Sequence, residues 1–215
     1  DVLKRLSTNS HLYYTLIPES SRYMSRKKLS VTLGVKAAAN EWILITEPTC
    51  APQSDKWLAT MARHCNESND MVIGYSNYES SAPLYYRFER LQTEYYSLCE
   101  TQKGIAYRHS GSNLLFRKSI FLNGEGFRGN LNLVRGEYDF IVNKFAEKGN
   151  TATETSPEAW VREETPTRKA WKYRHLYYLE TRKILSRSLA HRFLFNLDQS
   201  MLHLSFMASA AALVA

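Results

Sequence analysis

Short apolar segments alternate with longer amphipathic segments along this chain, and the alternation restricts its fold more than any other feature. The clearest apolar run, Trp42 to Ile45, has the length of a buried strand and ends abruptly in Thr46-Glu47-Pro48. Strands are expected at residues 12–17, 42–46, 71–75, 105–107, 113–116 and 151–155, and helices at 25–39, 55–64, 84–98, 137–148 and 167–197. This order predicts an α/β fold with a mixed, mostly parallel sheet flanked by helices.

The apolar positions also predict which side of each helix faces the core. Ser25 is the expected N-cap of the first helix. Its inward residues would be Leu29, Leu33 and Ala37, and those of the second helix Trp57, Leu58 and Met61. In the third helix, steps of four and three residues join Leu84, Phe88, Leu91, Tyr95 and Leu98, a clear amphipathic pattern.

The chain is basic, with a formal net charge of +7 and a pI of about 9.3. Nine arginines and lysines lie between Arg162 and Arg192, against only three glutamates. This excess predicts an anionic partner, and nucleic acid, a phosphorylated small molecule and an anionic membrane all remain open. Because 44% of the residues are hydrophobic, wholesale disorder is excluded.

The three cysteines and the apolar end of the chain bear on its compartment. Cys50, Cys65 and Cys99 are too scattered for a disulfide framework or a CxxC metal site, which fits a reduced, cytosolic compartment. Residues 201–215 form an apolar run shorter than the roughly 20 residues that span a bilayer. This run is interpreted either as the start of a transmembrane helix or as a C-terminal core helix.

Two short motifs are better explained as ordinary structure. Gly124 to Gly129 matches G-x-G-x-x-G, but polar residues flank it where a dinucleotide site needs a strand and an apolar helix, so a surface turn is expected. Gly74 to Tyr78 lacks the second glycine of a nucleophile elbow. The six histidines show no metal-ligand spacing.

Acids and bases placed at the ends of elements form the pattern that points to chemistry. Lys27 and Lys28 lie at a helix start, where exposed amides and the helix dipole favour a phosphate. Glu47 follows a strand and could hold a divalent ion bridging a diphosphate. A second carboxylate, Glu137 or Asp139 at a later helix start, could serve as a general base.

The order of four stretches resembles the family two glycosyltransferases, inverting sugar-nucleotide enzymes with a GT-A fold. SRKKLSVTLGVKAAANEWILITEPTCAP resembles the basic helix and buried strand that lead to the family's Asp-x-Asp motif. GSNLLFRKSIFLNGEGF resembles its acceptor-side segment, and LVRGEYDFIVNKFAEKGNTA the segment with its Glu-Asp motif. WKYRH, at residues 171–175, resembles the interfacial helix motif Gln-x-x-Arg-Trp.

The resemblance implies a role for each matching residue. It implies donor-diphosphate binding by Lys27, Lys28, Arg174 and His175, catalysis by Asp139 or Glu137, acceptor contacts from Gly111, Asn113 and Trp171, and a Mg²⁺ or Mn²⁺ site at Glu47 and Thr49. It implies transfer of a sugar from a nucleoside-diphosphate donor to a glycan or lipid-linked hydroxyl acceptor with inversion.

Three departures from the family pattern support an alternative, a catalytically inactive module that binds a glycan or a partner. Thr49 stands where the second metal carboxylate is expected, and Tyr138 where the base is expected. Trp171 and His175 replace the glutamine and tryptophan of the last motif. Threonine is a poor substitute because its neutral hydroxyl does not offset a cation's charge.

The resemblance also implies three parts and a location. Residues 1–165 would be a GT-A catalytic domain lacking its first nucleotide-binding strand, 166–200 a basic interfacial helix, and 201–215 the start of a possible transmembrane helix. The protein would then lie at the cytoplasmic face of a membrane, its basic helix against anionic lipid. A nucleic-acid-binding domain rests on charge and interleaved tyrosines alone, so nucleic acid is not the expected partner.

Overall fold

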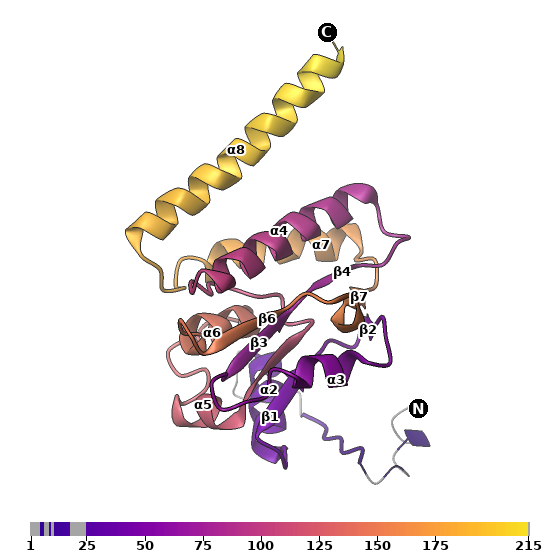
Figure 1. Cartoon of the computed structure of the whole chain (residues 1–215), viewed down its shortest axis with the longest axis vertical. Coiled ribbons are helices and arrows are strands. Elements are labelled where there is room, and N and C mark those ends of the chain that lie inside the picture. Colours follow the sequence, from indigo (N-terminus) through magenta and orange to yellow (C-terminus); the bar gives the residue numbers. More distant parts are fainter. Residues whose placement is uncertain (1–4, 7–8, 10, 18–24, 215) are drawn as a thin grey trace.

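The structure is a computed structural model of the 215-residue chain that describes residues 5–6, 9, 11–17 and 25–214 (Figure 1). The helices are α2 (Arg26–Ala37), α3 (Trp57–Ala62), α4 (Leu84–Gln102), α5 (Lys118–Asn123), α6 (Glu137–Phe145), α7 (Arg168–Thr181) and α8 (Leu189–Val214), with a 3-10 turn η1 (Pro157–Ala159). The strands are β1 (Trp42–Ile45), β2 (Cys50–Pro52), β3 (Met71–Gly74), β4 (Ser76–Tyr78), β5 (Leu114–Arg117), β6 (Thr151–Glu154) and β7 (Val161–Glu163). The expectations for residues 1–4 and 215 lie outside the described residues.

Two mixed sheets form the centre of the molecule, which confirms the mixed α/β fold. One sheet has the order β1-β5-β3-β6 and the other the order β2-β7-β4. Among the described residues three pairings are antiparallel and two are parallel, so the sheets are not mostly parallel as the sequence predicts. The antiparallel course of β5 between β1 and β3 accounts for most of this difference.

The apolar strands are buried according to their place in the sheet. Strand β3 lies between β5 and β6 and is buried along its whole length, as expected for a continuous apolar run. Strand β1 is only half-buried because it lies at an edge of its sheet. The predicted buried strand is therefore present, although it is less buried than its sequence suggests.

Helix α4 turns its predicted apolar face outward. The helix forms where the periodicity predicts it, yet Leu84, Phe88, Leu91 and Tyr95 are 78%, 44%, 42% and 65% exposed, and only Leu98 of that set is buried. Arg90 and Glu94 are instead among its buried residues. They face inward because α4 packs over β4, next to charged side chains of the second sheet.

Other sequence predictions, of buried helix faces and of two strands, are wrong. Helix α2 begins after its Ser25 cap as expected, but it buries Lys28 and Val35 in place of the predicted face. Leu58 on α3 is exposed, while Met61 is buried. Residues 12–17 and 105–107 are described and form no strand.

The basic C-terminal region consists of two helices, whereas the sequence predicts one helix over residues 167–197. Helix α7 ends at Thr181, and α8 begins at Leu189 and continues through residues 201–214. Figure 1 shows α7 beside α4 and α8 leading away from the body towards the C-terminus. Across the described residues, no helix combines the length and the apolar character needed to cross a bilayer.

The outward face of α4 can be tested by stability measurements. Phe116 on β5 is fully buried, so Phe116→Ala should lower the free energy of unfolding by about 3–5 kcal/mol. Leu84→Ala should change it by no more than about 0.5 kcal/mol, since Leu84 is exposed. Denaturant unfolding followed by circular dichroism measures both, and a large loss for Leu84→Ala would contradict the described packing of α4.

Candidate functional site

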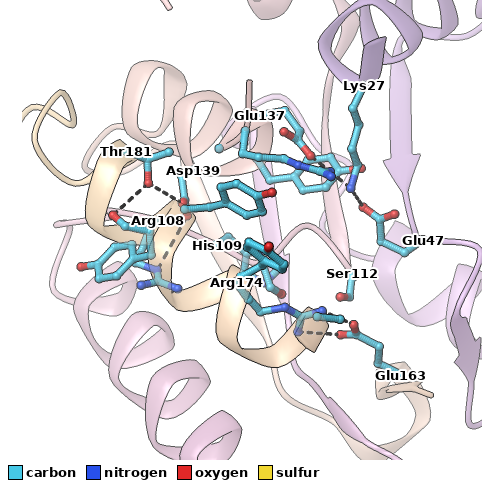
Figure 2. A pocket seen from close by; sticks show the side chains of 18 of the residues that line it. Lys27, Glu47, Arg108, His109, Ser112, Glu137, Asp139, Glu163, Arg174 and Thr181 are labelled. Carbon is cyan, nitrogen blue, oxygen red and sulfur yellow. Dashed lines mark hydrogen bonds and ion pairs between the residues drawn. The ribbon is translucent and has the colours of Figure 1, made fainter. Parts of the chain in front are cut away.

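A cavity of about 390 Å³ lies where α7 passes over the starts of α2 and α6 and the ends of several strands (Figure 2). Its lining is strongly charged. The cationic residues are Lys27, Arg90, Arg108, Arg135 and Arg174, and the acidic ones are Glu47, Glu137, Asp139 and Glu163. Six residues that the sequence singles out therefore meet here: Lys27, Glu47, Thr49, Glu137, Asp139 and Arg174.

Lys27 joins two of the predicted acids. Its ammonium Nζ lies 2.5 Å from Oε1 of Glu47 and 3.1 Å from Oε1 of Glu137, as Figure 2 shows. The side-chain oxygen of Ser25 accepts a hydrogen bond from the backbone N–H of Lys28, which fixes the first turn of α2 and hence the place of Lys27. The Tyr138 ring centroid lies 4.8 Å from the same Nζ.

Glu137 is buried at the first position of α6. Gly136 precedes it with φ of 87°, a left-handed conformation that glycine adopts without strain. Among the described residues, Oε2 of Glu137 has no hydrogen-bond partner. One oxygen of this carboxylate is thus held by Lys27, and the other is buried without a partner among the described residues.

Asp139 faces the cavity from the same helix turn. One carboxylate oxygen lies 3.7 Å from Nε of Arg108, and the other accepts a hydrogen bond of 3.5 Å from the Thr181 hydroxyl. Burial raises the pKa of Asp139, and Glu137 adds to this effect, while Arg108 opposes it. The side chain is therefore a stronger base than an ordinary aspartate whenever it is ionised.

Arg174 and Glu163 form the opposite ion pair. Both guanidinium nitrogens Nη1 and Nη2 of Arg174 donate to the Glu163 carboxylate, and Nη1 also donates to the Tyr78 hydroxyl over 2.7 Å. Burial alone would raise the pKa of Glu163, but Arg90 and Arg174 outweigh it and hold the pKa below its ordinary value. Glu163 thus stays ionised and fixes Arg174 in place.

A buried polar cluster at the wall of the cavity is absent from the sequence predictions. Arg90 on α4 pairs with Glu94 at 3.2 Å and with Glu163 at 3.4 Å. It also donates to the hydroxyls of Ser76 and Ser112. The sequence does place Arg90 and Glu94 one helical turn apart on α4. Without the structure, this spacing indicates an ordinary ion pair on an exposed helix face.

His109 lies in the same cluster as a neutral ring. Its Nε2 donates to the Gly74 carbonyl over 3.1 Å, and its Nδ1 accepts from the Gly111 N–H over 3.0 Å. Burial lowers the pKa of His109, although Glu94 opposes this effect. The ring therefore serves as a fixed spacer between β3 and the glycine turn.

Three of the predicted site residues are not among those that line the cavity, and they make contacts within the fold. The Lys28 ammonium donates to the carbonyls of Asn130 and Leu133, and burial lowers its pKa to about 8. Asn113 is fully buried and accepts from the Trp57 indole N–H. Gly111 has φ of 82°, and its missing side chain leaves room for the Tyr138 ring.

Trp171 and His175 build the contact between α7 and α4. The Trp171 indole N–H donates to Glu89 over 2.8 Å, and its ring stacks on Tyr86 with centroids 4.9 Å apart. Nε2 of His175 lies against the same Glu89 carboxylate, which raises the pKa of His175. Neither residue is among those that line the cavity.

The side chains present do not make a divalent cation site by themselves. Glu47 supplies one carboxylate and Thr49 a neutral hydroxyl, so the predicted pair offers a divalent cation only a single negative charge. Glu47 already holds the Lys27 ammonium. In the part of the chain that the structure describes, no group of three or more His, Cys, Asp and Glu residues could hold a metal ion.

Comparisons with known proteins bear on the fold. Neither the protein-family models nor the curated proteins give a match. Among solved structures, the chain resembles the mannosyltransferase PcManGT from Pyrobaculum calidifontis, determined in complex with GDP-Man and Mn²⁺. The TM-score is 0.59 and the identity 17%, over 85% of this chain and 50% of that protein. The likeness shows that the chain has a glycosyltransferase fold and spans about half the length of that enzyme.

The packing of the Tyr138 ring against Gly111 can be tested by comparing substitutions at two glycines. A Cβ at Gly111 would lie 1.9 Å from the Tyr138 ring, whereas one at Gly129, also at positive φ, meets no atom within 4 Å. Gly129→Ala should therefore cost only the backbone strain of about 1–2 kcal/mol, and Gly111→Ala about 3–5 kcal/mol. Chemical denaturation measures both, and equal losses would show that Tyr138 does not pack against Gly111.

Proposed function

We propose that this protein is a glycosyltransferase that moves a sugar from a nucleoside-diphosphate donor to a hydroxyl acceptor with inversion, in glycan or polysaccharide synthesis. The observation that carries the proposal is a single cavity that holds a buried carboxylate, Asp139, together with fixed cations, Arg174 and Lys27. The glycosyltransferase fold supports it.

The reaction assigns a task to each side of this cavity. Asp139 takes the proton of the acceptor hydroxyl as the acceptor oxygen attacks the anomeric carbon. The bond from that carbon to the diphosphate oxygen breaks, and the diphosphate leaves with the electron pair. Arg174 lies where it can stabilise the developing negative charge, because Glu163 holds its guanidinium ready before the donor arrives. A single in-line displacement inverts the anomeric centre.

The alternative is a catalytically inactive module that binds the donor or a glycan. The specific observation in its favour is Tyr138, which occupies the family's base position and is buried beside Glu47. Burial and the negative charge of Glu47 raise the pKa of Tyr138 far above its ordinary value, so this phenol does not act as a base. Catalysis then depends on Asp139, one residue further along α6.

Replacing Asp139 distinguishes an active glycosyltransferase from an inactive binding module. Asp139→Asn should slow sugar transfer by about 10²–10⁴-fold, because a general base contributes that much, while donor affinity changes little. The measurement is release of nucleoside diphosphate from UDP- and GDP-sugars in the presence of a glycan acceptor, with calorimetry for donor binding. Asp55→Asn, at an exposed position on the approach to α3, is the control.

Undiminished transfer by Asp139→Asn would contradict the assignment of the base. Donor binding without transfer by the unaltered protein would favour the inactive module.

We further propose that the protein lies at a membrane surface through α4 and α7. Helix α4 exposes a stripe formed by Leu84, Phe88, Leu91 and Tyr95, and α7 exposes Tyr173, Leu176 and Leu179. Tyr85, next to this stripe, contacts the Trp171 ring of α7 edge-on. The exposed Arg168, Lys169 and Lys172 of α7 add positive charge beside these apolar residues. Apolar and basic side chains together suit an anionic lipid surface.

The membrane proposal predicts a loss of vesicle binding when the stripe is made polar. Phe88→Ser combined with Leu91→Ser should weaken binding to vesicles containing an anionic phospholipid by about tenfold or more, since each side chain contributes apolar area. Co-sedimentation measures the bound fraction. Leu58→Ser is the control, because Leu58 is 62% exposed but lies on α3. An equal loss for both variants would contradict docking through α4.

A further inference from the structure

We propose that the ammonium of Lys27 supplies the positive charge that binds the donor diphosphate, in the place where enzymes of this fold use a divalent metal ion. The inference rests on the proposed function, because it concerns the donor of that reaction. It assigns to this chain a metal-independent mode of nucleotide binding.

The first support is the position of Lys27 between Glu47, the predicted metal carboxylate, and Glu137. Its Nζ contacts both Glu47 and Glu137, at 2.5 and 3.1 Å. These residues are 20 and 110 positions away along the chain (47 − 27 and 137 − 27), so the fold brings them to one cation. Glu47, the carboxylate of the predicted metal pair, thus already holds a positive charge, which it shares with Glu137.

The second support is the geometry of the ammonium. A lysine ammonium has three N–H donors and no acceptor. The structure pairs the ammonium with two carboxylates, Glu47 and Glu137, so by number one donor remains for a ligand. The Lys27 side chain is 33% exposed and lines the cavity, so a phosphate oxygen can reach it. The Tyr138 ring, 4.8 Å away, further restricts where the ammonium can move.

The third support is that a divalent ion and Lys27 exclude each other. A metal bound by Glu47 would share that carboxylate with the Lys27 ammonium, and like charges held by one carboxylate repel strongly in a partly buried site. Thr49, the other residue of the predicted metal pair, also lines the cavity, but its neutral hydroxyl does not compensate this repulsion. Removing the lysine charge should therefore create the metal dependence that the unaltered protein lacks.

The test is calorimetric titration of the intact protein with UDP and with GDP, each in the presence of EDTA or of Mn²⁺. We expect the unaltered protein to bind the nucleotide, with an affinity in EDTA that is within about twofold of its affinity in Mn²⁺. Lys27→Met should weaken binding in EDTA by about tenfold or more, the scale of one lost charge-assisted hydrogen bond, and Mn²⁺ should restore part of it. Lys27→Arg should retain more affinity than Lys27→Met.

A matched control and the remaining outcomes make the test decisive. Lys36→Met removes an exposed lysine from the last turn of the same helix and should leave the affinity unchanged. If Mn²⁺ raises the affinity of the unaltered protein for UDP or GDP by about tenfold or more, this inference is overturned and the proposed function is left intact. Unchanged affinity of Lys27→Met in EDTA would also overturn it. Absence of binding to both nucleotides in both conditions would overturn the proposed donor itself.

Discussion

The buried guanidinium of Arg90 is the interaction on which the architecture around the cavity depends. A charge removed from water is tolerated only when it is paired and hydrogen-bonded, and Arg90 meets this condition with partners from four segments: Glu94, Glu163, Ser76 and Ser112. Helix α4 must therefore present its polar side to the second sheet, which leaves its apolar side outside. Through Glu163, the same cluster holds Arg174 at the cavity.

Local signals in the sequence located most elements but not their orientation. The Ser25 cap and the apolar runs of β1, β3 and β5 depend on neighbouring residues, so the sequence predicts them. Periodicity on α4 shows that the helix has two faces. It does not show which face is buried, because ion pairs stabilise the buried Arg90. Strands β2, β4 and β7 are only three residues long and lack apolar alternation, so no local signal marks them.

The candidate site shows the same division. Sequence order and family resemblance indicate Lys27, Glu47, Glu137, Asp139 and Arg174, and the fold gathers them in one cavity. What the sequence does not indicate is their pairing, because each ion pair joins segments far apart along the chain. Arg108, for example, reaches Asp139 from the loop before β5, directly after residues 105–107, which the sequence predicts as a strand. Roles assigned separately to a metal ligand, a base and a phosphate contact thus become parts of a single charge arrangement.

Helix α7 belongs to the cavity on one side and to the molecular surface on the other. Arg174 and Tyr177 line the cavity, while Leu176 and Leu179 of the same fourteen-residue helix are exposed. The guanidinium of Arg174 is tied to β7, so the helix does not slide freely over the sheet. Because Arg174 lies on α7, any displacement of the exposed side of this helix would also displace the guanidinium at the cavity, so α7 couples the molecular surface to the charge arrangement of the cavity.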